Sequence, residues 1–382
     1  SSGRVPAGKN TLVQPSLLST SKAEMVPEPL QELDAYSQYK PMHDPTKKKR
    51  PGQYLDHVIE IANSRTEFAC DAFETYDPRV GFVLFSTTDW AGHILAKLSS
   101  EEDRAQFYRH LIGEVAEGAE RLASFCDNVL LMSDHGFERK HRTVHVADWL
   151  RDQGHLVEKQ QGSKSMPERV LNGAADAAVS TAKALSRRSD RLYGFFRLVH
   201  NRLMGTDVGA RLQSAARPDI DYRNSQVWQL RYGCLYLNDD RFTNPQVDEG
   251  DVERLREGLI SELSELETED GNPIFREVLA PEEAYADPAD DVPDVIPRPA
   301  SGHFPITHWS PTGGYTSPTE SFEHRYRGLI AAQGPMFGSG DVEEMSIINV
   351  LPTLMAGLGE PLSPDFDGEA RTDLLADPPP VT

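Results

Sequence analysis

Thr88-Asp89-Trp90-Ala91-Gly92-His93 and Ser133-Asp134-His135-Gly136 are the two segments that decide the predicted fold. Each comes directly after an apolar run, at 80–85 and at 128–132. An apolar run of this length that stops at a turn is typical of a buried strand. The sequence therefore predicts two strands, at 80–86 and 128–132, each followed by a turn that carries an Asp and a His.

Helical spacing precedes and separates these two strands. Apolar residues recur at helical intervals across 54–76 and again across 101–122. Ser99 and Glu102 stand in capping-box register, which predicts the start of the second helix. Strand, helix and strand in succession predict an α/β fold with a mostly parallel central sheet and helices on both faces. In such sheets ligands bind beyond the carboxyl ends of the strands, where both Asp/His pairs fall.

The rest of the sequence predicts an inserted helical cap and a second core part. Residues 160–222 lack strand signals and are rich in Ala and Arg, which favours a helical cap. A basic amphipathic helix that contacts a membrane or an anionic substrate is the alternative. The predicted organisation is a first core part at 1–159, the cap at 160–222, a second core part at 223–376 and a disordered tail at 377–382. The second core part is expected to contain strands at 226–230, 233–237 and 328–332, helices at 251–267 and 345–358, and a loop at 281–300.

Composition narrows the class of partner. The 382 residues include 39 Lys and Arg against 60 Asp and Glu, which gives a formal net charge of −21. This charge opposes binding to nucleic-acid duplexes, whose phosphates need a basic face. The three cysteines form no CxxC motif, so neither a zinc ribbon nor a disulfide framework is predicted. No apolar stretch reaches the about 18 residues that cross a bilayer, and no signal peptide is recognised, so we expect a cytoplasmic protein.

The two Asp/His pairs are candidate metal ligands, because carboxylate and imidazole together bind divalent ions such as zinc. Asp89 as a helix N-cap beside a surface His93 is the alternative explanation of the first pair. Asp134 and His135 would point to opposite faces of a continuous strand, so they can share an ion only where Gly136 lets the chain turn. Further imidazoles come from a cluster ahead of the strand at 328–332, namely His303, His308 and His324.

These motifs resemble those of the alkaline phosphatase superfamily, and the closest branch is the type I phosphodiesterase/nucleotide pyrophosphatase group with its related phosphohydrolases. The matching segments are Asp89-x-x-Gly92-His93, Ser133-Asp134-His135-Gly136-Phe137, and His324-Arg325-x-x-Gly328 ahead of Ala332-Gln333-Gly334-Pro335. Supporting segments are Val146-Ala147-Asp148-Trp149-Leu150, Tyr232–Asn238, Pro293-Asp294-Val295, Asn349–Leu354 and Asp365-Phe366-Asp367-Gly368.

The resemblance implies two divalent metal ions, zinc or manganese, and assigns their ligands. One ion would be held by Asp89, His93 and His324, with His308 as the alternative to His324. Asp134 and His135 would hold the other ion.

The resemblance also implies a nucleophile that the sequence does not reveal. Members of the superfamily carry an Asp at the end of a first strand and a Thr or Ser nucleophile shortly after it. No such strand is visible in 1–79, where the hydroxyl candidates are Ser16, Ser19, Thr20 and Ser21. Since the sequence starts at Ser1 and not at Met, we expect a fragment without the N-terminal strand and its nucleophile.

The function that the resemblance implies is metal-dependent hydrolysis of a phosphorylated small molecule by two-metal phosphoryl transfer. No Cys-x-Pro-x-Arg segment is present, which argues against the sulfatase branch. A phosphotransferase or phosphomutase of the same superfamily is one alternative. A non-catalytic scaffold that retains the fold is the other. Neither the substrate nor the oligomeric state can be predicted from the sequence.

Overall fold

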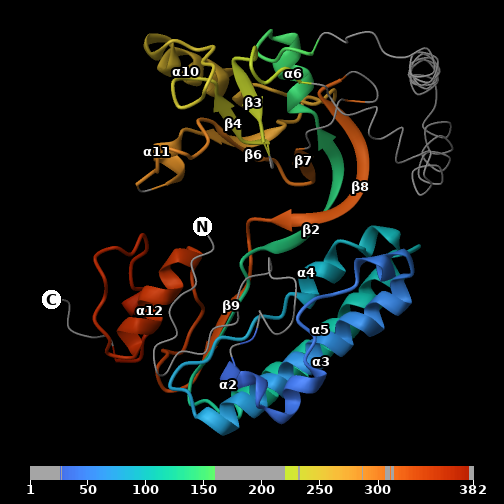
Figure 1. The fold of residues 1–382 in the computed structure, drawn as a ribbon, viewed down its shortest axis with the longest axis vertical. Helices are drawn as coiled ribbons and strands as arrows, with labels where there is room; N and C mark the ends of the chain where they lie inside the picture. Colours follow the sequence, from blue (N-terminus) through green and yellow to red (C-terminus); the bar gives the residue numbers. More distant parts are fainter. Residues whose placement is uncertain are drawn as a thin grey trace. The chain divides into compact units, whose positions relative to one another are not determined.

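The computed structural model describes most of the chain, namely residues 26, 28–159, 220–230, 233–285, 287–305, 310 and 314–377. The chain forms two compact units: unit 1 comprises Ser1–Glu138 and Ser321–Thr382, and unit 2 comprises Arg139–Glu320. It passes between them within strands β2 (Gly136–Val144) and β8 (Thr316–Arg325) (Figure 1). Most of the predicted cap and of the tail lies outside the described residues, so the domain boundaries at 159 and 222 stay predictions.

Unit 1 contains two long helices, which the spacing of apolar residues predicted. They are α3 (Pro51–Tyr76) and α5 (Glu101–Ala123). Near their N-terminal ends, Tyr54 and Phe107 share one buried cluster. Further along both helices, the Arg121 guanidinium of α5 forms an ion pair with the Glu67 carboxylate of α3. The contacts advance in the same direction, so the helices run parallel and lie side by side (Figure 1).

The cap of α5 differs by one residue from the predicted one. The Ser100 hydroxyl, and not that of Ser99, accepts a hydrogen bond of 3.0 Å from the N–H of Asp103. Three acidic residues in the first turn then face the positive end of the helix dipole. The prediction of a capped start was right in kind, because two adjacent serines offer the same chemistry.

The prediction of a strand at 80–86 was wrong. Residues 81–85 form no regular secondary structure and no ladder with any strand of the described residues. The side chain of Phe82 is 79 % exposed. The Arg65 guanidinium donates a hydrogen bond of 2.7 Å to the Leu84 carbonyl oxygen. Apolar composition favours burial, but a strand also needs a neighbouring backbone to pair with, which the pattern cannot supply.

The predicted strand at 128–132 is present as β1 (Val129–Met132), but its partner differs from the expected one. It pairs with β9 (Ile330–Gln333), and the pairing is antiparallel, with Leu130 opposite Ala332. The described strands form small sheets, and the large parallel sheet is not seen among them. A parallel ladder occurs between β2 and β7 (His303–Pro305) in unit 2. The fold is therefore mixed α/β.

The first Asp/His motif lies on a short helix of unit 1, α4 (Thr87–Gly92). Ala91 on its inner face is fully buried in a cluster with Tyr54 and Leu111, which fixes α4 against both long helices. The helix starts before Asp89, so this residue is not the N-cap and its carboxylate is free to point elsewhere. The alternative of a capping Asp was therefore wrong.

Unit 2 has its own apolar core. The predicted strands at 226–230 and 233–237 are present as β3 (Val227–Gln229) and β4 (Leu235–Leu237), which pair antiparallel. The predicted helix at 251–267 is present as α10 (Val252–Ser264) and buries Leu259 and Leu263 in this core.

The segment 281–300 is not simply the predicted loop. It contains α11 (Pro281–Ala284) and strand β6 (Ile296–Pro299), which pairs antiparallel with β5 (Phe275–Leu279). The sequence did not predict β6 because it contains prolines, which lack the N–H that a strand donates to its neighbour and are uncommon within strands.

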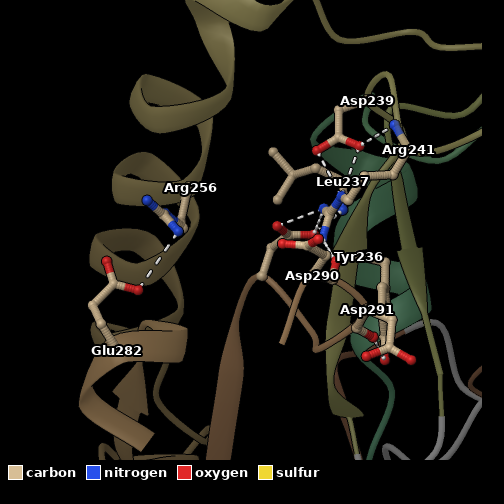
Figure 2. A network of polar contacts seen from close by, with 9 residues as sticks. Tyr236, Leu237, Asp239, Arg241, Arg256, Glu282, Asp290 and Asp291 are labelled. Carbon is tan, nitrogen blue, oxygen red and sulfur yellow. Dashed lines mark hydrogen bonds and ion pairs between the residues drawn. The ribbon is translucent and has the colours of Figure 1, made fainter. Parts of the chain in front are cut away.

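An ion network holds the β4 end of unit 2 together (Figure 2). The Arg241 guanidinium donates hydrogen bonds to both Asp239 and Asp294, at distances of 2.6 to 3.1 Å. Both carboxylates are buried, and Asp294 also accepts a hydrogen bond of 2.8 Å from the N–H of Leu237. Burying two carboxylates is tolerated because one cation and a backbone donor satisfy them.

The remaining described elements are short. None of the helices in the described part of the chain is long and apolar enough to cross a bilayer. The predicted helix at 345–358 is present as η6 (Ile347–Asn349) followed by α12 (Val350–Gly357). The others are α2 (Glu28–Gln31), η1 (Asp34–Gln38), η2 (Pro45–Lys49), η3 (Leu95–Lys97), α6 (Val146–Asp152), η5 (Glu249–Asp251) and η7 (Thr372–Leu374).

Candidate metal centre

Three separate parts of unit 1 bring the predicted site residues together. Helix α4 carries Asp89, and His93 is its C-terminal cap residue. Asp134 and His135 lie in the turn between β1 and β2, and His324 is the second-last residue of β8. The motif residues thus come from a helix end, a strand-to-strand turn and a strand end.

One carboxylate oxygen is the focus of the site. Asp89 Oδ1 lies 2.9 Å from Nε2 of His324 and 3.5 Å from Nε2 of His93. Nε2 of His135 lies 3.9 Å from the same oxygen. Three imidazole nitrogens therefore surround a single carboxylate oxygen, in the donor combination that zinc prefers.

The imidazoles also approach one another. The Nε2 atoms of His93 and His324 are 3.1 Å apart, and the rings of His135 and His324 stack at a centroid distance of 3.6 Å. Asp89, His135 and His324 offer ligand atoms that all lie within 4.8 Å of one another. Cationic imidazoles repel at such distances, and these side chains could hold a divalent ion between them.

Asp134 stands at the rim of this group. Its side chain is 73 % exposed, and its Oδ1 lies 3.5 Å from Nε2 of His135. The same oxygen accepts a hydrogen bond of 3.0 Å from the N–H of His135. The two neighbouring side chains therefore lie on one side of the turn. Gly136 does not have the left-handed backbone conformation expected from the sequence; instead, a Cβ atom there would lie too close to the Arg327 carbonyl oxygen, so glycine is needed for close packing.

The electrostatics of the site depend on Asp89. Burial opposes its ionisation, but hydrogen bonds and charges from His93 and His324 outweigh burial and lower the pKa of the carboxyl group. Hydrogen bonds to Asp89 and then to Glu323 raise the pKa of His93 to about 9. Burial and the neighbouring His135 lower the pKa of His324. In the metal-free site we therefore expect His93, and not His324, to be protonated.

Phe137 is a site residue to which the sequence assigned no role. Its ring lies 5.1 Å from that of His93, 5.2 Å from that of His324 and 5.8 Å from that of His135, measured between centroids. It was quoted only as the end of the Ser133–Phe137 motif. Phe137 therefore packs against all three imidazoles of the site.

Gly92 makes room for this ring. A Cβ atom at Gly92 would lie 2.6 Å from Cε1 of Phe137, which is too close for a real contact. The Asp89-x-x-Gly92-His93 motif therefore needs glycine for packing and not for backbone freedom.

We expect Gly92→Ala to destabilise unit 1 by about 1–3 kcal/mol, the usual cost of overpacking, and to weaken metal binding because Phe137 must move. Urea unfolding and zinc titration measure the two effects. Gly113→Ala is the matched control, since nothing lies within 4 Å of its Cβ position on α5. An effect at Gly92 no larger than at Gly113 would contradict the packing argument.

The other candidate residues fall elsewhere. His303 belongs to unit 2, where its Nδ1 lies 3.2 Å from the Ser301 carbonyl oxygen. His308 lies outside the described residues, as do the hydroxyl candidates Ser16, Ser19, Thr20 and Ser21. Of the two described histidines of the cluster ahead of β9, His303 and His324, it is His324 that lies beside Asp89.

Comparison with known families identifies the family of this chain. The sequence model of the family described as type I phosphodiesterase / nucleotide pyrophosphatase matches residues 10–326. No curated protein and no solved structure matched the chain. The matched range includes all five predicted ligand residues and covers far more than half of the sequence. The chain therefore belongs to the type I phosphodiesterase / nucleotide pyrophosphatase family.

Proposed function

We propose that this protein is a metal-dependent phosphoester hydrolase whose first ion is held by Asp89, His93 and His324. Family membership supports the general class, a phosphoester hydrolase of the phosphodiesterase/pyrophosphatase type. The single observation that carries the finer proposal is the position of Asp89 Oδ1, 2.9 Å from Nε2 of His324 and 3.5 Å from Nε2 of His93.

The donor set fits a zinc-type ion. One carboxylate oxygen and two imidazole nitrogens make up a usual ligand set of catalytic zinc, which leaves the fourth position open. When bound, such an ion neutralises charge on the phosphoryl oxygens and lowers the pKa of bound water. Manganese also accepts carboxylate and imidazole ligands, so metal identity is part of the test.

Asp134 and His135 are proposed ligands of a second ion. His135 Nε2 lies 3.5 Å from Asp134 Oδ1 and 3.9 Å from Asp89 Oδ1, so this imidazole borders both positions. Two ions about 4 Å apart would suit the attacking and leaving oxygens of a phosphoryl group. The substrate that we propose is a phosphorylated small molecule, because the ions would supply local positive charge to a protein of net charge −21.

The chain's own residues would orient and desolvate the phosphoryl group. Phe137 forms an apolar boundary of the imidazole cluster, and Asp89 keeps His93 and His324 directed to one point. Catalysis by positioning and charge neutralisation needs this rigidity, because misplacement by about 1 Å costs about 100-fold in rate.

The test combines metal analysis with hydrolysis of bis(p-nitrophenyl) phosphate. We expect the protein to bind zinc, and any turnover to be lost in EDTA and recovered when zinc or manganese is added. A chain without its nucleophile would still bind zinc but would hydrolyse this substrate poorly. His324→Ala should abolish both properties. His110→Ala is the matched control, because His110 lies on α5 of the same unit and its side chain is 55 % exposed.

The other outcomes decide between the alternatives. Transfer of the phosphoryl group to an added alcohol in preference to water would favour a phosphotransferase. Zinc binding without turnover of any phosphomonoester, phosphodiester or pyrophosphate would favour the scaffold. Absence of zinc and manganese binding would contradict the metal site itself.

A further inference from the structure

Two consecutive residues of β8 approach the same imidazole on its two opposite nitrogens. Glu323 Oε2 lies 3.3 Å from Nδ1 of His93. Nε2 of His324 lies 3.1 Å from Nε2 of His93. Neighbouring residues of a strand normally point to opposite faces. The ring of His93 therefore lies across the edge of β8 and approaches one side chain from each face. All three residues belong to unit 1.

The contact with Glu323 decides which nitrogen of His93 carries hydrogen. An ionised carboxylate only accepts hydrogen bonds, so Glu323 favours the form of His93 that carries hydrogen on Nδ1. Nε2 is then the nitrogen that can offer a lone pair, and it faces Asp89 and His324. The contact therefore fixes both the orientation and the tautomer that a metal ligand needs.

A comparison with His135 shows what the carboxylate adds. Nδ1 of His135 lies 3.2 Å from the Gly136 carbonyl oxygen, which is a neutral acceptor. Glu323 is a charged acceptor, and its side chain is only 23 % exposed, so solvent screens it incompletely. A charged partner makes the opposite nitrogen a stronger donor to a metal than a carbonyl does.

We propose that Glu323 is a positioning residue that locks His93 and strengthens it as a metal ligand. The inference rests on the proposed function only through the first metal site, and it does not depend on which phosphoester is hydrolysed. Partners of this kind typically change metal affinity by about 10- to 100-fold.

The experiment measures zinc affinity by competition with a chromogenic chelator for the wild type, Glu323→Gln and Glu323→Ala. We expect Glu323→Ala to weaken binding by about 10- to 100-fold. Glu323→Gln should fall between the two, because the amide oxygen still accepts the hydrogen bond but carries no charge. Glu344→Gln is the matched control: it removes a carboxylate that is 73 % exposed in the same unit, so zinc affinity should not change.

Two further measurements separate positioning from other roles. Thermal unfolding in EDTA tests whether the variants fold, independently of metal. The visible spectrum of the cobalt-substituted protein reports the ligand set. We expect the same spectrum type in Glu323→Ala as in the wild type, because Glu323 is not itself a ligand. A change of coordination number would make Glu323 a ligand and overturn the proposal.

The outcomes distinguish this inference from the proposed function. Zinc affinity of a folded Glu323→Ala equal to that of the wild type would overturn the role of Glu323 alone. A wild type that binds zinc but hydrolyses no phosphoester would contradict the proposed function and leave the role of Glu323 intact. A wild type that binds no divalent metal would contradict both.

Discussion

Asp89→Asn is expected to lower zinc affinity and kcat/KM for a phosphodiester by about 100- to 1,000-fold or more, the scale seen when a charge-stabilising group is removed from an active site. Asn has nearly the same shape, so the change removes charge and one acceptor without opening a cavity. The effect should be large because Asp89 Oδ1 is the atom that all three imidazoles approach, at 2.9, 3.5 and 3.9 Å. Zinc competition titrations and steady-state kinetics measure it.

Asp134→Asn provides the comparison within the same site. Its side chain is 73 % exposed and it contacts His135 alone among the imidazoles. We therefore expect the tighter zinc-binding step to survive in Asp134→Asn while the weaker one is lost. Equal loss of both steps in the two variants would show that the ions cannot be assigned to separate ligand sets, and zinc affinity of Asp89→Asn within threefold of the wild type would contradict the central role of Asp89.

Arg241→Met is expected to destabilise unit 2 by about 3–5 kcal/mol, because it leaves two buried carboxylates without their cation. Asp239 and Asp294 are each 5 % exposed. Met keeps the volume of the side-chain stem, so the loss isolates the charge. Urea unfolding followed by tryptophan fluorescence measures the change, since Trp149 and Trp228 both lie in this unit.

Arg254→Met is the matched control for Arg241→Met. Arg254 pairs with Asp251 on the surface with its own side chain 79 % exposed, and such pairs contribute about 0–1 kcal/mol. Adding Asp239→Asn and Asp294→Asn to Arg241→Met should recover part of the lost stability. Similar losses for the two arginine variants would mean that the buried network contributes no more than a surface pair.

Local patterns predicted the elements that local forces determine. The helical spacing across 54–76 and 101–122 corresponds to α3 and α5, because an amphipathic helix is specified by residues within a few turns of one another. The strand β1 and the turn carrying Asp134 and His135 were predicted for the same reason. The N-cap of α5 is Ser100 and not the predicted Ser99, so such local signals locate a helix start to within about one residue.

Strand pairing was beyond the reach of these patterns. The run at 80–85 and β1 have similar apolar sequences, yet only β1 gains a ladder, with β9 about 200 residues away in sequence. Whether a strand pairs parallel, antiparallel or not at all depends on which distant backbone reaches it. The expected mostly parallel sheet therefore did not follow from strand–helix–strand order.

The sequence by itself supplied the candidate ligands, since two short motifs that follow apolar runs combine Asp and His, the side chains that zinc accepts. Only the tertiary structure decided how these residues meet. His324 reaches Asp89 across 235 residues of sequence, and Glu323 and Phe137 act on His93 through contacts that no local motif encodes. The physical reason is that a binding site depends on distances between side chains, and those distances are fixed by the packing of α4, β8 and the β1–β2 turn against one another.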